Sequence, residues 1–324
     1  MKRFLIAITF LMIFLFLPLT CRPALSFEGP LQVGNQFPPF LIVDPPYLEE
    51  AAYENSFSAS LSHSSTFMVR NSSSWSVNID LETTELNLRY KRIVAGLFEM
   101  GIDVPILSFN SGFMDDFLRS YHDFFGFSDY GRSSRPENQF LYEVRRNGEL
   151  VLKGKSGRIG LGDIRLTAKR EILSGDPCLS VMANVELPTG QASAGFGNGS
   201  LDAGAAVLVD KNIGEKVKTY FNLGAVFPGD LRAENVVKLG NFIYGGAGVE
   251  AALWKNLSLL GQVMFQNSPF PKTGVSTMDR ISALLAIGAR YTSGKNSLEF
   301  SLTEDPNTAG APDFTMNVSF KRRF

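Results

Sequence analysis

Apolar and polar residues alternate along most of the chain with a period of two, which is the pattern of a β-strand with two unlike faces. The last stretch, DFTMNVSFKRRF at 313–324, is typical. From 314 to 320 every second residue is apolar, namely Phe314, Met316, Val318 and Phe320. Comparable runs recur through the sequence, each of about ten residues, the length that a tilted strand needs to cross a bilayer.

Twelve such strands are predicted. They cover residues 55–68, 75–90, 95–106, 160–172, 177–187, 201–210, 216–227, 242–254, 257–267, 281–292, 296–303 and 313–323. Tight turns such as 174–176 and 293–295 alternate with longer connections such as 188–200 and 228–241. This asymmetry is typical of outer-membrane barrels, whereas a soluble β-sandwich does not show it. We therefore expect an all-β fold, a transmembrane antiparallel up-and-down β-barrel of about 12 strands.

The N-terminus has the pattern of a cleaved signal peptide, residues 1–26. Two basic residues precede an apolar run at 4–19, and the small residues Ala24-Leu25-Ser26 form a cleavage site. A membrane anchor or lipid attachment at Cys21 fits the pattern less well. The mature chain then consists of a segment at 27–54, either periplasmic or a plug, and a barrel at 55–324 that we place in the outer membrane of a Gram-negative cell. Its single cysteine, Cys178, excludes an internal disulfide.

The charge balance gives no reason to expect nucleic acid as a partner, because 31 basic and 32 acidic residues leave a net charge of -1. Charged residues of both signs fall on the faces opposite to the apolar ones, so they are expected to point into the barrel. These residues are Glu99, Asp103, Asp163, Arg165, Lys169, Glu171, Glu186, Asp202, Lys218, Glu250, Arg290 and Glu299. They either pair and fill the lumen, which their mixed sign favours, or line a polar channel.

One segment has helical rather than strand periodicity. In the long connection at 107–159, expected to be extracellular, aromatic residues recur at helical spacing within 112–126. Ser111 is a suitable N-cap and Gly126 a suitable end of an amphipathic helix. The helix either covers the barrel mouth as a plug or lid, or lies on the outer leaflet. Its acidic polar face favours the lid over an interfacial helix, which is usually basic.

A sheet that spans hydrocarbon must close, because an open edge would leave backbone groups without hydrogen bonds. The last strand is therefore expected to pair with the first and to turn its apolar residues toward membrane lipid. The terminal Phe324 resembles the C-terminal signature that the barrel-assembly machinery recognises, although Arg322 departs from that signature and is expected at the level of the lipid headgroups. The expected partners are membrane lipid, this machinery and a small-molecule cargo.

Candidate catalytic chemistry is sparse, since the mature chain has two histidines, His63 and His122. Ser62 and Ser64 flank His63, but alternation sends neighbours in a strand to opposite faces. The polar neighbours of His122 lie at helix offsets that do not face each other. We therefore predict no enzyme, no catalytic, cofactor-binding or metal-binding residue and no cofactor, although loop carboxylates could bind calcium loosely.

Short motifs carry two resemblances. GFMD at 112–115, HDFFG at 122–126 and the GR and RP pairs within 131–136 resemble an uncharacterised family of proteobacterial outer-membrane proteins, known as a domain of unknown function. GLGD at 160–163 and LPTG at 187–190 are similar to exported barrel-like proteins of a phenol-degradation (meta-) pathway. The second resemblance implies that hydrophobic compounds cross the outer membrane. Neither family supplies functional residues for transfer.

Three functions remain open at this point. The first is narrow or gated passage of a small molecule, with a hydrophobic cargo among the options. The second is a closed structural or adhesive barrel that displays its outer loops. The third is a membrane-embedded lipid hydrolase, which would depend on one of the two histidines.

Overall fold

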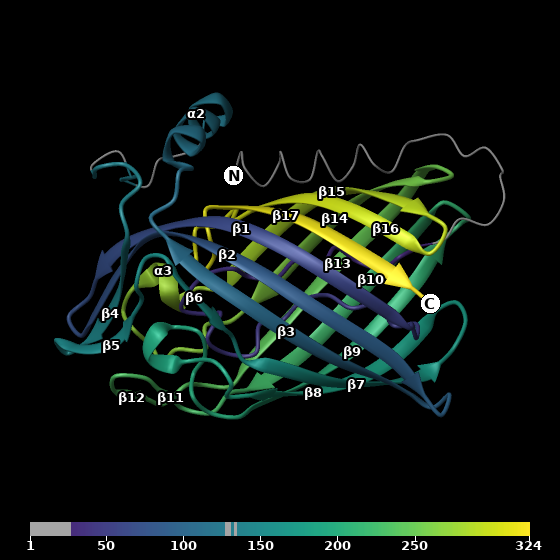
Figure 1. Cartoon of the computed structure of the whole chain (residues 1–324), viewed down its shortest axis with the longest axis horizontal. Helices are drawn as coiled ribbons and strands as arrows, with labels where there is room; N and C mark the ends of the chain where they lie inside the picture. Colours follow the sequence, from purple (N-terminus) through teal and green to yellow (C-terminus); the bar gives the residue numbers. More distant parts are fainter. Residues whose placement is uncertain (1–26, 127–130, 133–134) are drawn as a thin grey trace.

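The computed structural model describes residues 27–126, 131–132 and 135–324. The predicted signal peptide, residues 1–26, lies outside the described residues. Within these ranges, the dominant feature is a single closed wall of antiparallel strands (Figure 1).

The wall consists of twelve long strands within the described ranges. They are β1 (Ser56–Asn71), β2 (Trp75–Val94), β3 (Phe98–Asn110), β7 (Ile164–Leu173), β8 (Cys178–Leu187), β9 (Asp202–Ile213), β10 (Val217–Phe227), β13 (Phe242–Trp254), β14 (Leu257–Gln266), β15 (Ser282–Ser293), β16 (Asn296–Glu304) and β17 (Phe314–Arg323). Each pairs with its neighbours along the chain, and β1 pairs with β17 from Ser56↔Arg323 to Ser65↔Phe314. The predicted 12-strand antiparallel barrel is confirmed.

The long connections gather at one end of the barrel, called the loop end, and the tight turns gather at the other, called the turn end. At the loop end, β4 (Leu141–Arg146) extends the wall beside β2, and β5 (Glu149–Lys153) pairs with β4. Strand β6 (Arg158–Leu161) pairs with β3, while β11 (Leu231–Arg232) and β12 (Val236–Val237) form a small hairpin. The short helices η2 (Ala192–Ala194) and α3 (Ser276–Asp279) complete this end.

The two faces of the wall differ as the alternation predicts. On β17, Val318 is 45% exposed and Phe320 is 40% exposed, whereas the intervening Ser319 and the neighbouring Asn317 are buried. The same holds on β16, where Phe300 faces outward and Ser301 inward. Apolar side chains outside and polar side chains inside suit a wall in contact with hydrocarbon. In the described part of the chain, no helix is both long and apolar enough to cross a bilayer.

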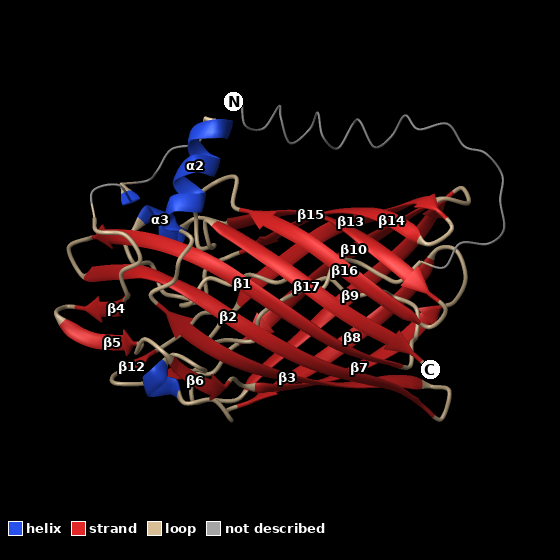
Figure 2. Cartoon of the chain, turned by 45° about the horizontal axis from the view of Figure 1, so that its top comes forward, coloured by secondary structure: helices blue, strands red, loops and turns tan. Residues whose placement is uncertain are grey.

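Helix α2 (Asp115–Phe125) packs against the outside of the wall (Figure 2). Met114 and Leu118 are buried against Phe314, which belongs to the outward-facing row of β17. The expectation of a lid over the mouth is therefore wrong. The physical reason is that the outward apolar row of β17 extends to Phe314 at the loop end of the strand. The apolar face of α2 packs on this residue and buries it, so that Phe314 does not contact lipid. Phe124 stays 83% exposed.

Polar contacts fix α2 in this position. The Glu82 carboxylate on β2 accepts hydrogen bonds from the backbone N–H groups of Phe113, at 2.8 Å, and Met114, at 2.5 Å. Arg132 contacts Asp115 on the helix, lies 3.2 Å from Ser65 Oγ on β1 and lies 2.5 Å from Asp313 Oδ2 just before β17. The helix is thus attached to β1, β2 and β17 at once.

The exposed row of β17 gives a test of the membrane-spanning wall. Because Val318 lies at the middle of its strand, Val318→Lys should lower the free energy of unfolding from bilayers by about 2–4 kcal/mol, the cost of a lysine at the bilayer midplane. Ile213→Lys, at the exposed end of β9, should cost about 0–1 kcal/mol. Equilibrium urea unfolding in lipid vesicles measures both, and equal costs would contradict the predicted depth.

Candidate functional site in the barrel lumen

The lumen is occupied by the chain's own N-terminal segment, residues 27–55, drawn in purple inside the barrel in Figure 1. Almost every residue from Glu28 to Ala51 is buried. Five prolines, at 30, 38, 39, 45 and 46, deny this segment the backbone N–H groups that strand pairing needs. Its strand-like pairing among the described residues is one isolated bridge, Gly34↔Tyr47. Side chains therefore hold the segment in place.

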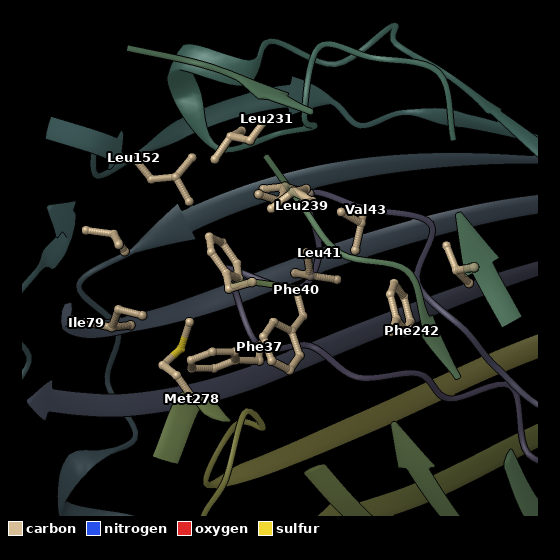
Figure 3. Close-up of a cluster of buried hydrophobic side chains, with 14 of the residues drawn as sticks. Phe37, Phe40, Leu41, Val43, Ile79, Leu152, Leu231, Leu239, Phe242 and Met278 are labelled. Carbon is tan, nitrogen blue, oxygen red and sulfur yellow. The ribbon is translucent and has the colours of Figure 1, made fainter. Parts of the chain in front are cut away.

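The middle of the segment is apolar and lies at the loop end. Phe37, Phe40, Leu41, Ile42 and Val43 are buried in one cluster with side chains of the wall and the loops (Figure 3). Their partners include Trp75, Val77, Ile79 and Leu81 of β2, Phe242 of β13, and Phe270 and Met278 of the loops. Such a cluster excludes water from the loop end of the barrel.

The two ends of the segment are acidic and meet basic side chains of the wall. The segment contains five carboxylates, Glu28, Asp44, Glu49, Glu50 and Glu54, and no lysine or arginine. Each carboxylate has a basic partner. The pairs include Asp44 with Arg165 at 3.1 Å, Glu49 with Lys91 and with Arg89 at 3.5 Å, Glu50 with Lys218 at 2.7 Å, Glu54 with Lys321 at 3.1 Å, and Glu28 with Arg323 at 2.9 Å. Charge complementarity thus binds the segment to the wall.

The pKa values of the segment reflect this pairing. Burial alone would raise the pKa of Glu49, but Lys91, Arg89 and Lys169 lower it to about 2. The pKa of Glu54 lies well below its usual value because Lys321, Lys91 and Arg323 outweigh the effect of burial. For Asp44, burial prevails over the attraction of Arg165 and raises the pKa. The carboxylates near the turn end are therefore held in their charged form.

The predicted inward charges do lie inside the barrel, and several pair along the wall. Arg290 lies 2.9 Å from Glu250 and 2.5 Å from Glu299, and Lys169 lies 3.0 Å from Glu99. The partners that the N-terminal segment supplies were not predicted. Arg89 and Lys91 of β2, which bind the segment, were not predicted to be among the inward charges either. The sequence signal for this pairing was the presence of five acidic residues and no basic residue between positions 27 and 54.

A cavity of about 50 Å³, lined mainly by polar residues and partly open to solvent, lies beside the segment. Its wall side includes Ser58, Ser60 and Ser62 of β1 and Glu85, Asn87 and Arg89 of β2. Along β2 the inward row changes abruptly: Leu81 belongs to the apolar cluster, and Thr83, the next inward residue, begins the polar part. The lumen therefore has an apolar loop end and a polar middle.

The candidate catalytic residues do not form a nucleophilic site. His63 faces outward, with Nε2 2.8 Å from Glu82 Oε2 and Nδ1 2.9 Å from Thr84 Oγ1. Ser62 faces the lumen, where its Oγ accepts a hydrogen bond from Asn317. The side chain of His122 lies outside the described part of the chain. Cys178 is buried with a free thiol, and no group of three metal-ligating side chains gathers among the described residues.

Solved structures resemble the fold. The COG4313 outer membrane channel from Pseudomonas putida F1 has 15% identity and a TM-score of 0.55, with 87% of this chain and 100% of that chain covered. The NanC porin has 6% identity and a TM-score of 0.48, over 83% and 100% of the two chains. The Pseudomonas putida toluene transporter TodX has 9% identity and a TM-score of 0.41, over 94% and 100%. The first of these supports the fold of an outer-membrane channel.

Sequence comparison gives a family but no characterised relative. No curated protein matches the chain. A family model described as "Protein of unknown function (DUF3187)" matches residues 23–324, which is nearly the whole chain and includes both the segment and the barrel. This confirms the predicted membership of an uncharacterised outer-membrane family: the chain belongs to the DUF3187 family of proteins of unknown function.

Proposed function

We propose that this barrel conducts a small molecule through a lumen that residues 28–54 open and close as a gate. The proposal rests on the observation that side-chain contacts, and not strand pairing, hold the gate against the wall. It lies inside the lumen without joining the hydrogen-bond ladder of the wall, since its strand-like pairing in the described chain is the Gly34↔Tyr47 bridge within the gate itself. The wall closes through β1 and β17 alone. The gate can therefore leave while the barrel stays folded.

The lining of the lumen bears on the cargo. Apolar side chains line the loop end, but the inward row of β2 is polar or charged from Thr83 to Lys91. A purely hydrophobic molecule would desolvate these groups without offering them hydrogen bonds, which costs free energy. The geometry therefore supports a cargo with polar groups better than the hydrophobic cargo suggested by the phenol-pathway resemblance.

A second candidate is a closed barrel that displays its loops to a partner. The apolar cluster favours it, because Phe37 and Phe40 with their loop partners fill the loop end. The two candidates differ in whether the gate moves. A gate that never leaves the lumen would make the barrel a structural or adhesive scaffold.

The remaining partners follow from the surface of the barrel. We infer that the exposed apolar band meets outer-membrane lipid. We also infer that the assembly machinery binds the C-terminal strand through Phe324, which is 44% exposed and lies 5.9 Å from the ring of Tyr90. A lipid hydrolase is not supported, since the contacts of His63 are Glu82 and Thr84 rather than a serine.

Weakening the ion pairs should open the gate. Glu49→Gln combined with Glu54→Gln removes the carboxylates that face Lys91, Lys321 and Arg323. Breaking one buried pair costs about 3–5 kcal/mol, so the population of the open state should rise more than about a hundredfold. Planar-bilayer recordings of the full mature chain measure this as open probability. The matched control, Glu149→Gln with Glu234→Gln, changes the same charge at exposed positions and should behave as wild type. Equal conductance of both variants would favour the closed scaffold.

The pH dependence has a definite sign. The folded-state pKa of Glu49, about 2, lies below its ordinary value of 4.5. The stability that this group contributes is therefore complete above pH 4.5 and is lost as the pH falls toward 2. Conductance of the wild-type barrel should stay constant between pH 7 and pH 5 and rise on acidification below about pH 4.5. Opening that starts above pH 5 would contradict the assignment of Glu49 as an anchor.

A further inference from the structure

The polar cavity beside the gate contains oxygen atoms that nothing in the described structure satisfies. Three of its lining residues have one such atom each: Oε1 of Gln36, Oδ1 of Asn87 and Oε2 of Glu186. The side chains of Gln36 and Glu186 are only 5% and 4% exposed. All three atoms are hydrogen-bond acceptors. A buried acceptor without a donor costs about 1–3 kcal/mol, so each of these positions favours a ligand that donates.

A row of hydroxyl groups adjoins these acceptors on the same inner wall. Thr83, Ser64, Thr315 and Thr303 are register neighbours on β2, β1, β17 and β16. Each has a buried hydroxyl oxygen that lacks a partner among the described residues. The next row on β1 and β2 contains Ser62 and Glu85, which line the cavity. Hydroxyl groups both donate and accept, so this part of the wall suits a ligand with the same ability.

The charged groups of the cavity are largely paired. Arg89 lies 2.9 Å from Asp103, and Arg165 lies 3.1 Å from Asp44. Glu85 accepts a 2.6 Å hydrogen bond from Gln36. An anionic ligand would therefore have to compete with the carboxylates beside both arginines. The unsatisfied capacity of the cavity is for hydrogen bonds, and it includes one donor, because Nε of Arg165 has no hydrogen-bond partner among the described residues.

We propose that this cavity is a binding site for a small uncharged polyhydroxylated solute, of the class of short-chain polyols. Such a solute presents several O–H donors to Gln36, Asn87 and Glu186, and its oxygens accept from the lining hydroxyl groups of Ser58, Ser60 and Ser62. The identification of this solute as the cargo rests on the proposed function, whereas its binding does not. The site lies between the gate and the inner wall, including β1, β2 and β8, so that a bound solute contacts both gate and wall.

Calorimetric titration of the detergent-solubilised full mature chain tests the site. The probes are glycerol, erythritol and ribose, with benzyl alcohol as the apolar probe and propylamine as the cationic one. At least one polyol or sugar should give a saturable heat. Asn87→Leu and Glu186→Leu each remove an acceptor, and each should weaken binding about tenfold, since one hydrogen bond contributes on the order of 1.4 kcal/mol. The controls Asn212→Leu and Glu234→Leu make the same changes at exposed positions and should bind as wild type.

Each outcome decides the proposal. The gel mobility of unheated samples establishes first that every variant has formed its barrel. No saturable heat from any polyol or sugar, or equal affinity in the lumen variants and their controls, overturns the site. Binding of propylamine alone would show that Glu186 recognises a cation, which overturns the assignment to uncharged solutes. Binding without flux into proteoliposomes would support the binding site and contradict passage of the solute. Flux without binding would support passage and contradict the binding site.

Discussion

Hydrocarbon offers no hydrogen bonds to a protein backbone, and the architecture of this chain depends on that constraint. A sheet that faces lipid must return to its first strand, which β17 does by pairing with β1 along ten residues. Closure then divides every strand into an apolar outside and a polar inside. The polar inside creates a second requirement, because charged wall residues such as Arg290 and Lys169 must be satisfied where little water reaches them. The N-terminal segment meets much of this requirement.

The segment combines two kinds of attachment that respond to different conditions. Its apolar middle, around Phe37 and Phe40, is held by exclusion from water, which does not depend on ionisation. Its acidic ends are held by pairs with Lys91, Lys321 and Arg323, which depend on ionisation. Buried pairs of this kind contribute little net stability, but they are costly to break singly. They consequently define one position of the segment inside the lumen.

Much of the barrel could be predicted from the sequence, because a two-residue period is a local property. Each long strand begins and ends within a few residues of its predicted bounds, and β13 matches them at both ends. The position of α2 could not be predicted, since its aromatic face fits a mouth, a bilayer or a wall equally well. Only the outward row that ends at Phe314 decides among them. Residues 27–55 contact positions that are distant in the sequence, some of them more than 100 residues away, and no local pattern predicts such contacts.

The attachment of α2 has a consequence for the order of assembly. Phe113, just before the helix, contacts His63 and Glu82 of the first two strands, and the helix contacts Phe314 of the last strand. Arg132 joins Ser65 to Asp313 across the same junction. The surface on which the helix packs is therefore complete only after β17 has paired with β1. The helix thus covers, from the outside, the pairing of β1 with β17, where no loop connects the two neighbouring strands. It can pack there only as a late step of assembly.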